Sequence, residues 1–304
     1  MGNPQNKKEK YIHIIQEYLI KMPSLSTTAT KVLSVCNSPN TSAYDLNKVV
    51  SLDPVLTGNV LKLINSAYYF LRNPVTSLTQ AIIMLGLNTI KNLALSSAIL
   101  GAITQKKSLQ KNTMDIFWTH CISTGVWAKA LALETGIIKS ECEEYFVAGL
   151  LHDIGKIPLI HCFPADYMEI VVTATEKNLS LHTAEKAVFG MNHEEIGKLI
   201  VQKWKLEGAI SQVICTHHHL PQTDDETHNF VERVAVADIL SKITINGVEK
   251  KFPEDIFVET ILQDSLIRTF LKKHNLAPAT LKNLQEKSRT EIENAKLFIQ
   301  IAKG

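Results

Sequence analysis

The sequence has few of the features typical of secreted, membrane-spanning or nucleic-acid-binding proteins. Its five cysteines are an odd number, widely spaced, and form no Cys-x-x-Cys pair, which argues against a disulfide framework and favours reduced thiols. No apolar run approaches the length of a membrane span, and no signal peptide is recognisable. The net charge of +2 over 304 residues provides no general basic field. We therefore expect a cytoplasmic protein that binds neither nucleic acid nor membranes.

Several common enzyme signatures are also missing. The chain has no Ser/His/Asp nucleophile pattern, no P-loop and no dinucleotide-binding glycine motif. No stretch of any length alternates with the period of a β-strand, and no internal repeat is visible. Hydrophobic residues make up 45% of the chain and charged residues 20%, which is ordinary for a globular protein. The chain is long enough for one large or two small domains.

Apolar residues instead recur at helical spacing almost throughout, for example from Tyr11 to Met22 ahead of Pro23. Helix N-termini are predicted by Ser42 with Asp45, by Asp53 before Pro54, and by Ser77 with Gln80. We predict an all-α fold, in which residues 1–105 form an N-terminal helical bundle. Residues 106–304 are predicted to form a second helical domain that carries the candidate site and the C-terminal helices.

The second half of the chain contains the helices that matter for function. The predicted helices run from Phe117 to Leu133, Glu141 to Leu151, His193 to Trp204 after an Asn192 N-cap, Glu207 to Thr216, Val231 to Ile243, and about Pro278 to Ala302. The polar segment from Gly101 to Asn112 is expected to be a linker or an exposed loop.

The most informative motif is the string from Gly149 to Lys156, which contains His152-Asp153. The apolar residues before it predict a helix whose buried face brings this pair to the interior. A buried aspartate is costly unless a positive group holds it, and a metal ion is one such group.

Further imidazoles and one more carboxylate lie on or near the other predicted helices. The candidate metal ligands are His120, His152, Asp153, His193, His217, His218 and Asp238. This set exceeds what one ion needs and suits two divalent ions that share Asp153. Its donors favour Fe first, or Mn, Zn or Ni, over Ca or Mg. Such a centre could activate a water and hold a phosphoryl group, and Lys156 could bind a phosphate oxygen. Asp153 and Lys156 are the candidate catalytic residues. His13, His182, His228 and His274 lie outside this pattern and are expected to be exposed.

The order of these residues resembles the HD phosphohydrolase superfamily and, more closely, its HDOD branch (HD-related output domain). The resemblance runs from about Met22 to about Ile243. It rests on Leu52-Asp53-Pro54, Asn65 to Tyr69, Ala81 to Leu87, Phe117 to His120, Gly149 to Lys156, Asn192-His193 with Gly197, Trp204, Ile214 with His217-His218, and Ala237-Asp238. It implies a bacterial signal-transduction protein with an HD-type metal centre and a protein partner. The alternative is a metal-dependent phosphohydrolase that acts on a nucleotide or another phosphate ester.

The chain departs from the family pattern at a few positions. Ser26 and Glu207 stand where prolines are usual, which we interpret as loop details. The third histidine, His219, leaves open which two of the three adjacent histidines are ligands. The Gly-x-Gly-Tyr-Pro element of the related HD-GYP branch is missing after them, so we do not expect hydrolysis of cyclic di-GMP.

Overall fold

The computed structural model of this chain is all-α over the residues it describes, which are 4–25, 27–38, 40–104, 111–177, 179–222, 225–250 and 254–296. These residues contain no strand, which confirms the predicted fold class. The first helices are α1 (Pro4–Lys21), α2 (Thr27–Asn37), α3 (Ala43–Val50), α4 (Pro54–Ile64), the 3-10 helix η1 (Ala67–Tyr69), α5 (Leu78–Leu85) and α6 (Leu87–Thr104).

The remaining helices carry the candidate site and the C-terminal part of the chain. They are α7 (Lys111–Glu134), α8 (Cys142–Leu151), α9 (Lys156–Cys162), α10 (Pro164–Glu176), α11 (Leu181–Phe189), α12 (His193–Trp204), α13 (Gly208–Thr216), α14 (Glu226–Lys250), α15 (Glu254–Ile261), α16 (Ser265–Lys273) and α17 (Pro278–Ala295). None of the described helices combines the length and apolar character that crossing a bilayer requires.

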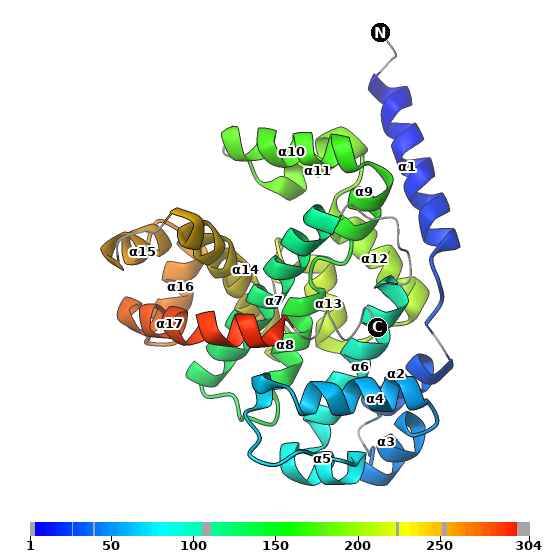
Figure 1. Cartoon of the computed structure of the whole chain (residues 1–304). Coiled ribbons are helices and arrows are strands. Elements are labelled where there is room, and N and C mark those ends of the chain that lie inside the picture. The colour runs from blue at the N-terminus through cyan, green and yellow to red at the C-terminus, as the bar shows by residue number, and fades with distance from the viewer. Residues whose placement is uncertain are drawn as a thin grey trace.

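The long helix α7 lies at the centre of the molecule and packs against α8, α14 and α17 (Figure 1). Helices α7 and α8 approach closely at two glycines. A Cβ atom on Gly149 would lie 2.6 Å from the Cα of Gly125, and one on Gly125 would lie 2.7 Å from the carbonyl oxygen of Phe146. Only hydrogen fits at these positions, so the two glycines set the distance between the helices.

The N-terminal helices divide into two groups. Helix α6 packs against α2, α4 and α5 and also against α8, which joins this group to the rest of the molecule. Helix α1 instead packs against α9 and α11, and it lies at the other end of the molecule from α3 and α5 (Figure 1). One continuous apolar core extends from Tyr11 to Ala295. The boundary near residue 105 stays a prediction.

The predicted helix starts agree with the structure, with one exception. Ser42 and Asp45 form a complete capping box, and Asp53 caps α4 with Pro54 at its first position. Ser77 caps α5 as expected, but the side chain of Gln80 accepts a hydrogen bond from the backbone of Thr76 (3.1 Å) and leaves the second half of that box unmade.

The helices also differ from prediction in extent. Helix α6 continues to Thr104 and α7 begins at Lys111, so the polar segment is helical at both ends; its residues 105–110 lie outside the described residues. Helix α14 is longer than predicted. Apolar residues recur at helical spacing only in its middle, and its two ends are polar. The last predicted helix is confirmed as far as Ala295. Helices α9, α10 and α11 were not anticipated.

Candidate metal centre

The structure brings the candidate ligands together from helices that are distant in sequence. His120 comes from α7, His152 and Asp153 from the end of α8, His193 from the start of α12, His217 and His218 from the end of α13, and Asp238 from α14. Two groups have ligand atoms that all lie within 4.8 Å of one another: His120 with His152 and Asp153, and His193 with His217 and His218. We call these groups site A and site B.

Asp153 lies between the two sites. Its Oδ2 atom is 3.2 Å from Nε2 of both His120 and His152. Its Oδ1 atom is 3.4 Å from Nε2 of His193 and 3.6 Å from Nε2 of His217. One carboxylate therefore presents one oxygen to each site, which is the geometry that a bridging ligand needs.

Asp238 completes site A. Its Oδ1 atom lies 3.1 Å from Nε2 of His120 and 3.5 Å from Nε2 of His152. The side chain is buried, and α14 holds it beside α7. Site A thus offers two imidazoles and two carboxylates.

Close backbone packing holds the two sites together. Gly155 ends the His-Asp turn and lies directly against the start of α12: an added Cβ would overlap the carbonyl oxygen of His193 and would lie 2.7 Å from the backbone nitrogen of Gly197. Helix α12 begins in a capping box in which Asn192 accepts from the backbone of Glu195 (2.9 Å). The first residue of that helix is His193, so the cap fixes where this ligand enters the site.

The outer ring nitrogens of the ligand histidines identify their tautomers. The Nδ1 atom of His152 lies 2.7 Å from the carbonyl oxygen of Gly149, and that of His217 lies 2.9 Å from the carbonyl oxygen of Val213. The Nδ1 atom of His193 lies 2.5 Å from a carboxylate oxygen of Glu185. Carbonyl and carboxylate oxygens only accept, so each Nδ1 carries a hydrogen, and in the neutral ring each Nε2 carries the lone pair.

His120 follows the same rule through a hydroxyl group. Its Nδ1 atom lies 3.0 Å from Oγ of Ser241, and this hydroxyl donates its own hydrogen to the carbonyl oxygen of Asp238 (2.8 Å). Ser241 therefore accepts from His120, and the Nε2 atom of His120 also bears a lone pair.

With the imidazoles neutral, the interior of the centre consequently holds Nε2 lone pairs and carboxylate oxygens close together. Nε2 of His193 faces Nε2 of His217 at 3.3 Å. Buried atoms that find no hydrogen-bond partner include His120 Nε2, His152 Nε2, Asp153 Oδ1 and Asp238 Oδ1. Such groups are destabilising unless cations lie among them. Both this arrangement and the imidazole–carboxylate donor set fit divalent transition-metal ions.

Burial and neighbouring charge shift the pKa values in the directions that metal binding requires. Burial lowers the pKa of His218 to about 2 and, with the adjacent imidazoles, holds the pKa of His217 well below its ordinary value. Burial would raise the pKa of Asp153, but His152, Lys156 and His193 outweigh it and hold that pKa well below its usual range. Both histidines are thus neutral and the aspartate is ionised near neutral pH, as ligands must be.

His152 behaves differently when no metal is bound. Burial would lower its pKa, but Asp153 and Asp238 outweigh burial and raise it to about 9. A proton can therefore stand in for a cation at site A at neutral pH. Site B has no such substitute on His217 or His218.

The side chains of the centre differ in exposure. The side chains of His152, His193 and His217 are fully buried, and Lys156 is buried with its ammonium 2.5 Å from Oδ2 of Asp153. His120, by contrast, is 13% exposed, and Lys242 is 45% exposed with its ammonium 2.6 Å from Oδ2 of Asp238. A small molecule would reach the centre from the side of His120 and Lys242.

The other histidines near the centre have distinct positions. His219 is 65% exposed and lies 2.7 Å from Glu194 through Nδ1, so the structure groups His217 and His218, not His219, with the other ligands. His182, which the sequence did not connect with the site, stacks on the ring of His218 with centroids 4.5 Å apart. The expectation that His182 is simply exposed is therefore wrong, because α11 turns this side chain toward the end of α13.

Sequence reasoning missed several residues around the ligands, namely Glu185, Glu194 as a hydrogen-bond acceptor, Ser241 and Lys242. Ser241 and Lys242 lie three and four residues after Asp238 in α14, and this helical spacing could have indicated them. Glu185 lies on a helix that was not predicted, and nothing in the local sequence marks it.

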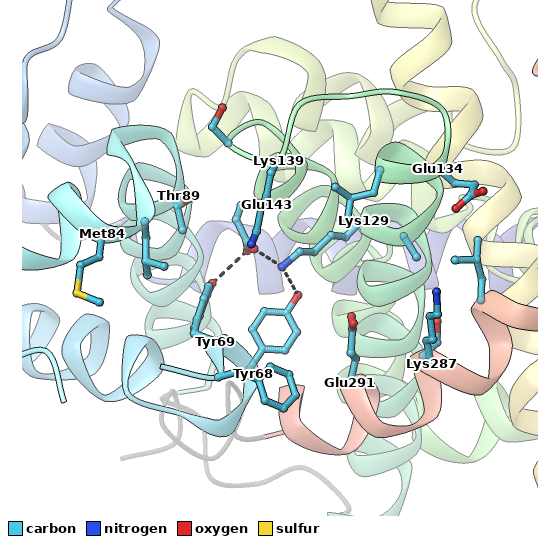
Figure 2. Close-up of a pocket in the computed structure, with 17 residues that line it drawn as sticks. Tyr68, Tyr69, Met84, Thr89, Lys129, Glu134, Lys139, Glu143, Lys287 and Glu291 are labelled. Atoms are coloured by element: carbon cyan, nitrogen blue, oxygen red, sulfur yellow. Dashed lines mark hydrogen bonds and ion pairs between the residues drawn. The ribbon is translucent and has the colours of Figure 1, made fainter. Parts of the chain in front are cut away.

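One cavity lies away from these ligands. It has a volume of about 810 Å³ and is lined by η1, α7, α8 and α17. Figure 2 shows a chain of polar contacts among its lining residues: Lys129 pairs with Glu143 and donates to the hydroxyl of Tyr68 (3.1 Å), while the hydroxyl of Tyr69 donates to Glu143 (3.1 Å). These four residues contain none of the candidate ligands.

Comparison with known proteins identifies the family. The HDOD domain model matches residues 22–220, and the chain belongs to the HDOD family. A curated relative, an uncharacterized protein of Treponema pallidum (strain Nichols), is 25% identical over 258 residues, which are 85% of this chain and 48% of the relative. The chain thus spans about half the length of that relative.

Solved structures share the fold. An HDOD domain protein of unknown function from Geobacter sulfurreducens has a TM-score of 0.69 at 23% identity, over 95% of this chain and 98% of that one. A protein from Shewanella amazonensis SB2B, proposed to be a phosphohydrolase, has a TM-score of 0.68 at 22% identity, over 96% of this chain and 98% of that one.

Proposed function

We propose that this HDOD protein is a signal-transduction protein built around a dinuclear metal centre. His120, His152 and Asp238 would hold one divalent cation, and His193, His217 and His218 would hold the other. Asp153 would bridge the two. We expect Fe first, or Mn, Zn or Ni, because imidazole-rich sites with carboxylates suit these ions.

One observation carries this proposal. Four buried Nε2 lone pairs converge on two buried carboxylates, and the outer nitrogen of each of these rings is already committed as a donor. The ammonium groups of Lys156 and Lys242 balance the charge of the two carboxylates, but a proton on His152 serves only site A and leaves the facing Nε2 atoms of His193 and His217 without a hydrogen. Two cations would accept all of these lone pairs, and the two oxygens of Asp153 lie where each cation would need one.

Metal analysis of the purified protein tests the proposal. We expect about two equivalents of transition metal per chain, measured by inductively coupled plasma mass spectrometry, and a strong loss in Asp153→Ala. The control is Asp166→Ala, which removes a carboxylate that is not among the candidate ligands and accepts from the hydroxyl of Tyr11 (2.9 Å). A wild-type protein that binds no metal after reconstitution would contradict the proposal.

The second candidate function is a metal-dependent phosphohydrolase acting on a nucleotide or another phosphate ester. The exposure of His120 and Lys242 favours it, because a substrate can reach these residues. When bound, two divalent cations would polarise the phosphoryl group and activate a water. Lys156 would hold Asp153 in place and neutralise phosphate charge, and Lys242 would attract the anionic substrate as a point charge.

A substrate panel separates the two functions. The metal-loaded protein would be tested with p-nitrophenyl phosphate, bis-p-nitrophenyl phosphate and nucleotides. Hydrolysis that Asp153→Ala abolishes would support the enzyme. Full metal occupancy with no hydrolysis would favour a signalling protein whose metal centre has a structural or sensory role.

A further inference from the structure

A fully buried carboxylate, that of Glu185, lies directly behind site B. Glu185 is on α11 and is 0% exposed. Its Oε2 atom accepts from the backbone nitrogen of His193 (2.9 Å) and from Nδ1 of the same residue (2.5 Å). Its Oε1 atom accepts from the hydroxyl of Tyr167 (3.2 Å). No lysine or arginine among the described residues forms an ion pair with it.

Burying such a carboxylate away from water costs free energy, so we ask which interaction its position provides. Glu185 holds both the ring and the backbone of His193, and His193 is the first residue of α12. The two hydrogen bonds fix the rotation of the imidazole and keep its hydrogen on Nδ1. The Nε2 lone pair therefore stays directed at Oδ1 of Asp153.

The Nδ1 atoms of the other ligand rings donate hydrogen bonds to neutral acceptors. His152 donates to the carbonyl of Gly149, His217 to the carbonyl of Val213, and His120 to the hydroxyl of Ser241. The carboxylate of Glu194 is 3.9 Å from Nδ1 of His217, which is beyond hydrogen-bond distance. Among these four rings, only that of His193 has a carboxylate within hydrogen-bond distance of Nδ1. An imidazole that donates to a carboxylate is a more basic and better-oriented ligand.

We infer that Glu185 is a positioning residue for site B, and that it makes the two sites unequal in metal affinity. The inference rests on the proposed metal binding and extends it. Removing the charge of Glu185 should weaken site B by about 10–100-fold, which is the usual effect of losing such a partner, and should leave site A almost unchanged.

Titration of chelator-treated protein with Zn²⁺ tests this inference by isothermal calorimetry. Wild type should bind two ions, and Glu185→Gln should lose about 10–100-fold in affinity at one of them. His193→Ala identifies the weakened site, because it should abolish the same binding event. The matched control is Glu293→Gln, which makes the same change on α17, where the side chain is 69% exposed and pairs with Lys296. It should leave both affinities unchanged.

A second readout does not need metal. In ¹⁵N spectra of the metal-free protein, His193 should be the Nδ1-protonated tautomer in wild type and a mixture in Glu185→Gln. Tyr167→Phe removes one hydrogen bond from Glu185. It should weaken Zn²⁺ binding at site B and mix the His193 tautomers in the same direction as Glu185→Gln, but by a smaller amount. This variant serves if Glu185→Gln does not fold.

Unchanged Zn²⁺ affinities in Glu185→Gln, or equal weakening of both sites, would overturn the inference, since equal weakening means a general structural role. An unchanged tautomer would overturn it as well. If wild type bound no Zn²⁺, the proposed metal function would fail separately, and the tautomer measurement would still decide whether Glu185 orients His193.

Discussion

The close approach of α7 and α8 can be tested by adding a single methyl group. In Gly149→Ala the new Cβ would lie 2.6 Å from Cα of Gly125, 2.7 Å from its nitrogen and 2.8 Å from the carbonyl carbon of Thr124. All three are backbone atoms, so no side chain can rotate aside to make room. The helices must move apart, and they carry His120 on one side and His152 on the other.

The expected magnitude follows from two opposing effects. Helix propensity favours alanine over glycine by up to about 1 kcal/mol, whereas overpacking a core costs about 1–3 kcal/mol and sometimes more. Because the clash is with backbone, we expect the upper end of that range. The net change in the free energy of unfolding should be a loss of about 2 kcal/mol, the difference between these two figures.

Gly58→Ala is the matched control. Gly58 is inside α4, and a Cβ there would have no atom within 4 Å. The same substitution should therefore stabilise the protein by about 0.5–1 kcal/mol. Urea denaturation followed by circular dichroism should move the two midpoints in opposite directions. If Gly149→Ala were as stable as wild type or more so, the argument that these glycines set the helix distance would be refuted.

Three further predictions concern buried polar groups. Lys129→Met should cost about 3–5 kcal/mol in urea denaturation because it leaves Glu143 buried and unpaired, and the added change Glu143→Gln should restore part of the loss. Chelator-treated protein should lose stability as the pH rises from 6.5 towards about 9, because the raised pKa of His152 stabilises the fold only while that residue holds its proton; unfolding midpoints of His152→Gln should lack this slope. Ser241→Ala should weaken metal binding through His120 by about 10-fold in a Zn²⁺ titration, and an unchanged affinity would contradict the role of that hydroxyl.

Much of the fold was predictable because its signals are local. The apolar period marks the amphipathic helices, and the caps at Ser42, Asp53 and Asn192 depend on atoms within three residues. Helices α9 to α11 were missed for the same reason. Helix α9 is almost wholly buried and has no polar face to define a period, and the short α11 buries Glu185, which no periodic pattern would place inside.

The identity of the ligands was predictable from the order of the motifs, which carries the family resemblance. Their arrangement in space was not. The sequence did not contain the pairing of each Asp153 oxygen with a different site, the burial of Lys156 or the approach of Glu185 to His193. These depend on contacts between helices, both distant in the chain, such as α7 with α14 and α8 with α13, and consecutive, such as α11 with α12. Sequence patterns indicate which side chains of one helix are buried, but not which neighbouring helix they contact.

The phenol–lysine–glutamate chain in the large cavity has a consequence for dissecting this protein. The phenols of Tyr68 and Tyr69 belong to η1, whereas the ion pair that they solvate belongs to α7 and α8. A fragment that starts near residue 106 would keep the two charges and lose both hydroxyls. The HD-like half would then be a poor candidate for separate expression, and any shorter version of this protein should retain η1 so that these charges keep their partners.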